Sequence, residues 1–327
     1  MKKNLAFTLL VMVMMGLLIS CSAGDSTADE GTENADEDAT QTDAGDSDFP
    51  LTVTDALDNE MTIEAKPERI VSLIPSNTEI AFALGLEDEI VGVTDNDDYP
   101  QEAQEKEKVG GMELNVEKII SLKPDLVLAH ASAEQNFKEA LKQIRDADIN
   151  VFVVQGAQQI DETYDTINQI GEITGTQETA EDIVSNMQEE FASLIDKTDS
   201  ISDDERKSVF FEVAPAPDMF TAGENTFFND LLRVVNADNV SKDQDGWTQI
   251  DPEAVVELDP DVIITTYGTD NDPVEQVTNR DGWEDMTAIK NDQVYQIDSD
   301  IVSRPGPRLV DGAKEIAKVV YPELFKE

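Results

Sequence analysis

Carboxylates are the most abundant residues able to do chemistry in this 327-residue chain, with 71 Asp or Glu against one cysteine, Cys21, and one histidine, His130. A lone cysteine excludes an intrachain disulfide and a Cys-x-x-Cys metal site, and a single histidine excludes a His-rich zinc site. A Ser-His-Asp triad would depend on His130, which directly follows an apolar run and is expected to be structural. The glycine-rich nucleotide fingerprint, the GxSxG elbow and the phosphate-binding loop are absent from the sequence.

Acidic residues outnumber basic ones by 71 to 23, which gives a net charge of −48. Such a surface repels phosphates and argues against nucleic-acid binding, and it suits an exported protein adapted to salt or alkali. A carboxylate pair could hydrolyse a glycosidic bond, so an exported hydrolase stays an alternative. No segment provides a full calcium-binding loop. We therefore expect a binding protein that is not an enzyme and has no resident cofactor or metal.

Strand-like apolar runs alternate with helical stretches along the chain after residue 48. The expected strands of the first half are 70–74, 126–129 and 151–154, and those of the second half are 209–213, 262–266 and 294–297. This alternation is typical of parallel sheets covered by helices, and the length suffices for two domains. The sequence therefore predicts an α/β fold of two lobes.

One segment occurs twice without a gap, because residues 115–129 match residues 251–265. Four pairs are identical: Glu117/Glu253, Leu122/Leu258, Pro124/Pro260 and Asp125/Asp261. Each copy predicts an N-cap at Asn115 or Asp251, a short helix with Ile119-Ile120 or Val255-Val256 facing inward, a Pro-Asp stop and a buried strand. The two lobes are thus expected to be built alike.

Residues 179–197 contain no Gly or Pro and place apolar side chains at steps of three and four. They predict one amphipathic helix of about 19 residues, roughly 28 Å long. A helical link would limit the lobes to a modest rocking motion, with a ligand held between them. We place the N-terminal lobe at 49–158, the linking helices, including this backbone helix, at 159–200 and the C-terminal lobe at 201–327.

An export signal is predicted at residues 1–21. Lys2 and Lys3 precede an apolar run over residues 5–19, which is too short to span a bilayer core of about 30 Å. Its end, Leu18-Ile19-Ser20-Cys21, resembles a bacterial lipobox and implies a lipid on Cys21 and an anchor outside the cytoplasm. Residues 22–48 hold ten acidic and no basic residues, which predicts an extended, disordered tether.

Several motifs follow one another in the order seen in one transport family. They begin with Arg69-Ile-Val-Ser-Leu-Ile-Pro-Ser-Asn and continue with Ile90-Val-Gly-Val-Thr, Asp98-Tyr-Pro, Val109-Gly-Gly and Lys123-Pro-Asp-Leu-Val. From about Ala65 to Phe325 the chain resembles class III solute-binding proteins, the ferric-siderophore and cobalamin receptors of ABC importers. The resemblance implies two Rossmann-like lobes, a backbone helix between them, and delivery of a metal chelate to a membrane permease.

The repeated glutamates have a role in that family, where a carboxylate at the tip of each lobe contacts arginines of the permease. Glu117 and Glu253 occupy those motif positions. A helix N-terminus alone would also favour a carboxylate there, by about 0.3–1 kcal/mol. Two glutamates at the same place in both halves suit a two-fold permease, so the resemblance predicts docking of a monomer through paired acidic tips.

Open α/β sheets bind ligands at the loops beyond the carboxyl ends of their strands. In these loops we predict ligand contacts from Pro75, Ser76, Asn77, Tyr99, Met112, Trp247, Tyr267 and Arg304. Trp247 lies at the motif position where cobalamin-binding members of the family carry a Trp that packs on the corrin. The aromatic positions of the N-terminal lobe instead read Asn96 and, approximately, Met112.

Charge narrows the choice of ligand. The predicted loops contain two basic residues, Arg304 and Arg308, whereas a trianionic catecholate chelate needs several. A neutral or cationic chelate is favoured, and cobalamin and ferric hydroxamates both qualify. Haem would need an axial ligand, for which Met112 is the loop candidate. We expect cobalamin, with a ferric hydroxamate siderophore as the alternative.

Overall fold

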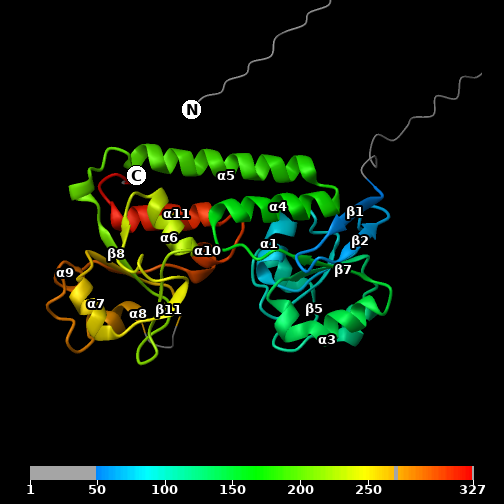
Figure 1. Ribbon diagram of the computed structural model, residues 1–327, viewed down its shortest axis with the longest axis horizontal. Helices are drawn as coiled ribbons and strands as arrows, with labels where there is room; N and C mark the ends of the chain where they lie inside the picture. The colour runs from blue at the N-terminus through cyan, green and yellow to red at the C-terminus, as the bar shows by residue number, and fades with distance from the viewer. Residues whose placement is uncertain (1–48, 269–271, 326–327) are drawn as a thin grey trace, which may run out of the picture. The chain divides into compact units, whose positions relative to one another are not determined.

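A computed structural model describes residues 49–268 and 272–325 (Figure 1). The predicted signal peptide, the lipid site at Cys21 and the acidic tether lie outside these ranges. No helix within the described ranges is both long and apolar enough to cross a membrane.

The first half of the chain forms a five-stranded parallel sheet. Its strands, in spatial order, are β5 (Glu107–Lys108), β4 (Ile90–Val93), β3 (Ile70–Ser72), β6 (Leu126–His130) and β7 (Asn150–Val154). Its helices are α1 (Pro75–Ala83), α2 (Val116–Ser121) and α3 (Ala133–Arg145), with a 3-10 turn at Gln101–Glu105. An antiparallel hairpin of β1 (Leu51–Thr54) and β2 (Glu60–Ile63) precedes the sheet.

The second half forms a four-stranded parallel sheet in the order β10 (Asp238–Asn239), β8 (Ser208–Glu212), β12 (Val262–Thr265) and β13 (Val294–Gln296). An antiparallel pair of strands, β9 (Phe220–Ala222) and β11 (Trp247–Gln249), lies beside it. The helices are α6 (Phe227–Val234), α7 (Pro252–Leu258), α8 (Pro273–Thr278), α9 (Thr287–Lys290), α10 (Ser299–Ser303) and α11 (Leu309–Val320), with a 3-10 turn at Asp203–Glu205. The predicted fold class and all six predicted strands are confirmed.

Two helices connect the sheets, α4 (Ile160–Thr174) and α5 (Gln177–Thr198), and α5 extends the predicted backbone helix slightly at both ends. Figure 1 shows α5 running beside α4 and α11. A Cβ at Gly171 of α4 would lie 2.5 Å from the Cβ of Ala180 in α5, so the close approach of these helices requires glycine there. The pair forms a tightly packed link.

A single hydrophobic core joins both sheets to α5. It contains Leu126 and Leu128 of β6, Val262 and Ile264 of β12, and Phe191 of α5. Because successive residues of a strand point to opposite faces, these alternating positions assign one face of each sheet to this core, and α5 joins it through the helices it packs on, α4, α6 and α11. The two lobes therefore share packing and are not independent bodies.

The repeated helices α2 and α7 cover the opposite faces. Ile119 and Val255 are fully buried there, in two separate cores. The expectation that a second aliphatic residue also faces inward was wrong, because Ile120 is half-buried and Val256 is exposed. Adjacent residues lie about 100° apart around a helix, so a helix of two turns presents only one of them to the core.

The caps and stops of the repeat are confirmed. The side chains of Asn115 and Asp251 accept hydrogen bonds from backbone N–H groups of the first turn, at 2.9 and 2.8 Å. The identical Pro-Asp pairs have a structural reason: Asp125 accepts the N–H of Glu68 at 3.0 Å, and Asp261 accepts that of Ser208 at 2.9 Å. Each carboxylate ties the end of its helix to the segment that leads into the neighbouring strand. The domain boundaries themselves stay predictions.

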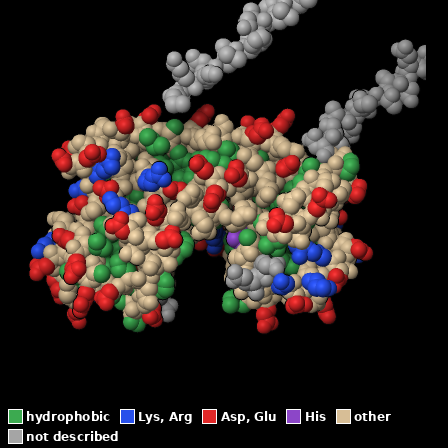
Figure 2. All heavy atoms as spheres, viewed as in Figure 1, with side chains coloured by type: hydrophobic (Ala, Val, Ile, Leu, Met, Phe, Trp, Pro, Cys, Tyr) green, Lys and Arg blue, Asp and Glu red, His purple; other side chains and the backbone are tan. Residues whose placement is uncertain are grey.

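Figure 2 shows this face of the molecule hollowed at its lower edge, between the part that carries α7 and α8 and the part that carries α3. Carboxylates are spread over the visible face and outnumber Lys and Arg side chains. The hollow lies where a ligand held between the lobes would enter.

Candidate functional site

Three predicted ligand residues, Pro75, Ser76 and Asn77, form the first turn of α1 and are not in a loop. Ser76 and Asn77 are buried, and the Asn77 amide donates a hydrogen bond to the Ala129 carbonyl at the end of β6, at 3.0 Å. The side chain of Asn77 therefore holds α1 against the sheet. Proline at the first helical position is a start signal that sequence reasoning could have used.

Three other predicted residues present exposed surface. Trp247 is 44% exposed, and its ring lies edge-to-face against the buried Phe228 at 5.2 Å between centroids. Tyr99 is exposed, and Met112 is 95% exposed. Trp247 thus combines packing against the core with exposed apolar surface, which a flat ligand can cover.

The loop after β4 is held together by hydrogen bonds within it and to Lys108. Asp97 turns inward, where its carboxylate accepts the N–H of Thr94 at 3.0 Å, and the Lys108 ammonium donates to the Asp97 carbonyl at 3.0 Å. Burial raises the pKa of Asp97, against the hydrogen bonds from Thr78 and Thr94 and the charge of Lys108 that lower it. The neighbouring Asn96, at the position where an aromatic residue was expected, is exposed.

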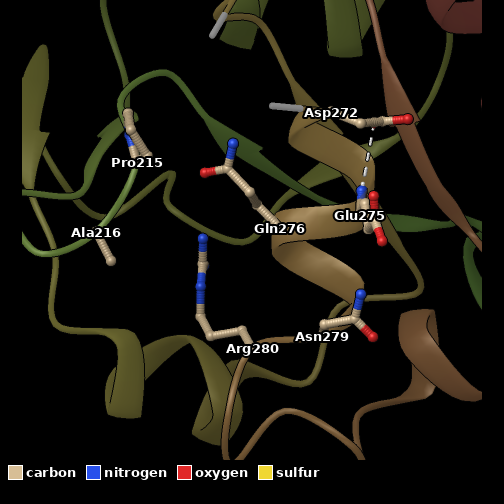
Figure 3. Close-up of a pocket in the computed structure, with 7 residues that line it drawn as sticks. All are labelled: Pro215, Ala216, Asp272, Glu275, Gln276, Asn279 and Arg280. Atoms are coloured by element: carbon tan, nitrogen blue, oxygen red, sulfur yellow. Dashed lines mark hydrogen bonds between the residues drawn. The ribbon is translucent and has the colours of Figure 1, made fainter. Parts of the chain in front are cut away.

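Tyr267 and an arginine that sequence reasoning missed, Arg280, meet at the end of β8. Figure 3 shows Arg280 in its pocket. The side chain of Glu212 is fully buried and accepts two hydrogen bonds from the Arg280 guanidinium, both at 2.7 Å. The Tyr267 hydroxyl donates to the same carboxylate at 2.6 Å. Burial, followed by the hydrogen bond and charge of Glu212, raises the pKa of Tyr267. Tyr267 therefore supports an ion pair.

No local signal marks Arg280 as part of this site. It lies 68 residues from Glu212 in the chain, just after α8, outside the loops expected from the strand ends. A glutamate that ends an otherwise apolar strand is the one hint in the sequence, because a buried carboxylate requires a partner.

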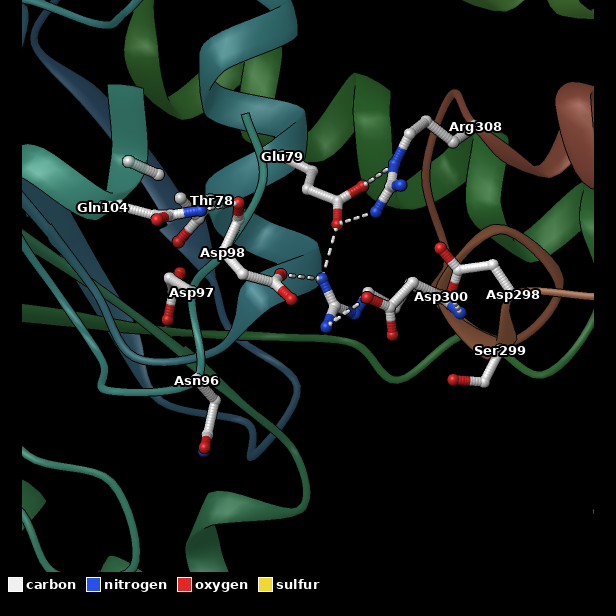
Figure 4. A network of polar contacts seen from close by, with 12 residues as sticks. Thr78, Glu79, Asn96, Asp97, Asp98, Gln104, Asp298, Ser299, Asp300 and Arg308 are labelled. Carbon is white, nitrogen blue, oxygen red and sulfur yellow. Dashed lines mark hydrogen bonds and ion pairs between the residues drawn. The ribbon is translucent and has the colours of Figure 1, made fainter. Parts of the chain in front are cut away.

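Arg304 belongs to an ion-pair network between the two halves of the chain (Figure 4). Its centre is Glu79 of α1, whose side chain is only 3% exposed. Glu79 accepts hydrogen bonds from Arg308 at 2.8 and 2.6 Å and from Arg304 at 2.9 Å. Arg304 also contacts Asp98 and Asp300, each at 2.7 Å. We call these five residues the interlobe clasp.

The carboxylates of the clasp neutralise the charge of Arg304, which was predicted to contact the ligand. Burial of Asp98 opposes its ionisation, but the hydrogen bond and charge of Arg304 dominate and lower its pKa. The Arg308 guanidinium also lies over the ring of Tyr99, at 3.9 Å from its centroid. Three carboxylates thus surround two arginines, so the clasp presents no net positive charge to an anionic ligand.

His130 ends β6 and is half-buried. Its Nδ1 accepts the backbone N–H of Ser132 at 3.2 Å, and a Cβ at Gly156 would lie 3.2 Å from the ring. An imidazole whose Nδ1 accepts a hydrogen bond carries its proton on Nε2 and is neutral. Burial lowers the pKa of His130. This geometry fits the structural role expected for it.

The described part of the chain holds no group of three or more His, Cys, Asp or Glu side chains placed to bind a metal ion. Glu117 and Glu253 are both exposed at the second position of α2 and α7. These two helices lie on the sheet faces opposite α5, so both glutamates are turned away from the shared core.

Residues 70–301 match the family model described as periplasmic binding protein. Over 85% of this chain and 88% of its relative, the sequence is 49% identical to the ABC transporter substrate-binding lipoprotein YvrC of Bacillus subtilis. It is 28% identical to the cobalamin-binding protein of Halobacterium salinarum, over 96% of this chain and 84% of that protein.

Among solved structures, a possible iron-binding, periplasmic solute-binding protein from Staphylococcus epidermidis superposes with a TM-score of 0.72. It is 39% identical and covers 78% of this chain and 99% of its own. These matches confirm the resemblance drawn from the ordered motifs. They also confirm a binding role, since the family consists of solute-binding proteins of transporters and not of enzymes.

We predict that Glu79→Gln destabilises the protein strongly. Removing one member of a buried ion pair leaves uncompensated charge, here on Arg308, which has no other carboxylate partner among the ion pairs of the described residues, and costs about 3–5 kcal/mol of unfolding free energy. Urea unfolding followed by circular dichroism measures the change. Asp285→Asn, which breaks an exposed ion pair with Lys290, is the control and should leave the urea midpoint unchanged. Equal midpoints for the two variants would contradict a structural role for the clasp.

We predict that His130 titrates below its ordinary pKa of 6.5. Between the lowered value and 6.5 the unfolded chain binds more protons than the folded one, so stability should rise with pH through that window. As the only histidine, it gives a single pair of imidazole C–H signals in a proton NMR titration. The variant His130→Gln should lose this slope of stability with pH. A titration midpoint at or above pH 6.5 would show that burial does not lower the pKa of His130.

Proposed function

Because this chain belongs to the periplasmic binding protein family, we propose that it is the receptor of an ABC importer and that its ligand is cobalamin or a closely related corrinoid. It would capture the chelate in the hollow between the lobes and release it to the permease after slight closure.

The observation that carries this proposal is the exposed face of Trp247, set against Phe228. A corrin is a large, flat macrocycle, and covering a tryptophan face buries apolar area on both partners. Nanomolar capture requires about −12 kcal/mol, of which such a contact supplies a part. The similarity to a cobalamin-binding protein over nearly the whole chain supports the same ligand.

The pairing of the arginines supports a ligand without negative charge. Arg280 is held by Glu212, and Arg304 and Arg308 are held by Glu79. A trianionic catecholate would have to displace buried carboxylates from these partners, which is costly. Cobalamin and neutral ferric hydroxamates face no such barrier.

A ferric hydroxamate siderophore is the second candidate. The observation in its favour is the 39% identity to a structure described as possibly iron-binding, together with the lack of aromatic residues at Asn96 and Met112. With one stacking surface in place of several, the hollow would also suit a compact chelate.

The lipid anchor and the permease contact complete the proposal. Cys21 would carry the lipid and hold the protein outside the cytoplasm at the cell membrane, as the name of the lipoprotein YvrC suggests for that relative. Glu117 and Glu253 would contact the two halves of the permease. The interaction between exposed charges is weak and screened by salt, so docking would rely on further contacts.

We predict that cobalamin quenches the tryptophan fluorescence of the full-length protein in detergent and that Trp247→Ala weakens binding roughly 10-fold or more, because it removes the apolar face. Titrations with cobalamin, a ferric hydroxamate and haem measure the affinities. Trp247→Phe keeps an aromatic ring and should retain most of the affinity. Quenching by the hydroxamate alone would reverse the order of the two candidates, and no response to any of the three would reject a chelate receptor.

We predict that the double variant Glu117→Lys with Glu253→Lys abolishes uptake while ligand affinity stays unchanged, because the reversed charges repel the arginines expected on the permease. Uptake of labelled cobalamin by cells measures the loss. Glu181→Lys with Glu189→Lys makes the same change in charge on exposed positions of α5 and is the control. Normal uptake with the tip variant would refute docking through these glutamates.

A further inference from the structure

The C-terminal lobe carries a polar pocket of about 470 Å³ at the end of β8 (Figure 3). Its lining comes from the loop after β8 and from α8 with the residues that follow it: Pro215, Ala216, Asp272, Glu275, Gln276, Asn279 and Arg280. In Figure 3 the guanidinium of Arg280 extends toward Ala216, and the amide of Gln276 points into the same space. The pocket lies at the carboxyl end of the sheet, where open α/β folds bind their ligands.

Arg280 is fixed in this pocket. Its two bonds to Glu212 set the plane of the guanidinium, and its cation lies over the buried ring of Trp283, at 4.1 Å from the centroid. Tyr267 donates a further hydrogen bond to the same carboxylate. A guanidinium has five N–H groups, and Glu212 takes two of them. Arg280 is therefore an oriented donor whose charge is already balanced.

The rim of the pocket is acidic. Asp272 and Glu275 are exposed there, and neither has a cationic partner among the ion pairs of the described residues. With Arg280 balanced by Glu212, the pocket has an excess of negative charge and disfavours a carboxylate. A primary carboxamide matches it, because its oxygen accepts from Arg280 while its NH₂ donates to the rim oxygens.

We propose that this pocket is a subsite for a neutral primary carboxamide on the periphery of the chelate, with Arg280 as a specificity-determining residue. The inference rests on the proposed function and sharpens it. Cobalamin carries several such amides around its ring, whereas a hydroxamate siderophore presents its metal-binding groups inward. The subsite would select the intact amide over the acid formed by hydrolysis.

Binding to the full-length protein in detergent tests the subsite, with cyanocobalamin and with cobalamin monocarboxylates in which one peripheral amide is hydrolysed. The wild-type protein should bind at least one monocarboxylate 10-fold or more weakly than cyanocobalamin. The double variant Asp272→Asn with Glu275→Gln should reduce the ratio of the two affinities, because it removes the repulsion between the rim carboxylates and the carboxylate of the ligand. Glu212→Gln with Arg280→Gln should weaken cyanocobalamin binding about 10-fold and abolish the selection, without leaving one buried charge unpaired.

Controls separate the subsite from general damage. Arg206→Gln removes an arginine that pairs with Asp203 elsewhere on the lobe, and it should leave both affinities unchanged. Arg280→Lys keeps the charge but loses the bidentate geometry, so its affinity should fall between those of the wild type and the double variant. Thermal unfolding monitors the fold of each variant.

The outcomes are distinct. Full affinity and unchanged selection in the variant with Glu212→Gln and Arg280→Gln would overturn the subsite and leave the proposed function standing. Failure of the wild-type protein to bind any corrinoid would overturn both. Equal affinity of the wild type for the amide and for every monocarboxylate would also refute the carboxamide assignment.

Discussion

One buried carboxylate connects the two halves of this protein. Glu79 lies in α1 of the N-terminal lobe. Its carboxylate accepts hydrogen bonds from Arg304 and Arg308, which lie 225 and 229 residues further along the chain. Burying this charge is favourable only because both guanidinium groups satisfy its oxygens. The position of α1, the approach of the segment after α10, and the placement of Tyr99 under Arg308 all depend on that arrangement.

Arginines are paired with buried carboxylates in the C-terminal lobe as well as between the lobes. In a chain with so large an acidic excess, each arginine near the strand ends is matched to a carboxylate, and Arg280 with Glu212 repeats in the C-terminal lobe what the clasp does between the lobes. In these pairs the carboxylates fix the orientation of the guanidinium groups and balance their charge, so the arginines do not attract anions. This balance is consistent with the proposed recognition of an uncharged ligand by shape and oriented donors.

The sequence predicted the elements well because their signals are local. Apolar runs marked the strands, the 3.6-residue period marked α5, and the repeat at residues 115–129 and 251–265 marked helices with equivalent caps and turns. The interlobe clasp and the Glu212–Arg280 pair could not be found this way, since their partners are far apart in the chain and carry no spacing rule. Pro75 was misplaced in a loop, although proline often begins a helix.

The core that α5 shares with both sheets limits how far the two lobes can move relative to each other. Bending the lobes apart would open a continuous apolar layer to water, so the empty and the loaded receptor must look much alike from outside. If the permease contacts only the proposed acidic tips, it would then bind the empty receptor as readily as the loaded one. Vacant copies would compete for the membrane complex, and import would slow when the receptor is abundant and its cargo scarce.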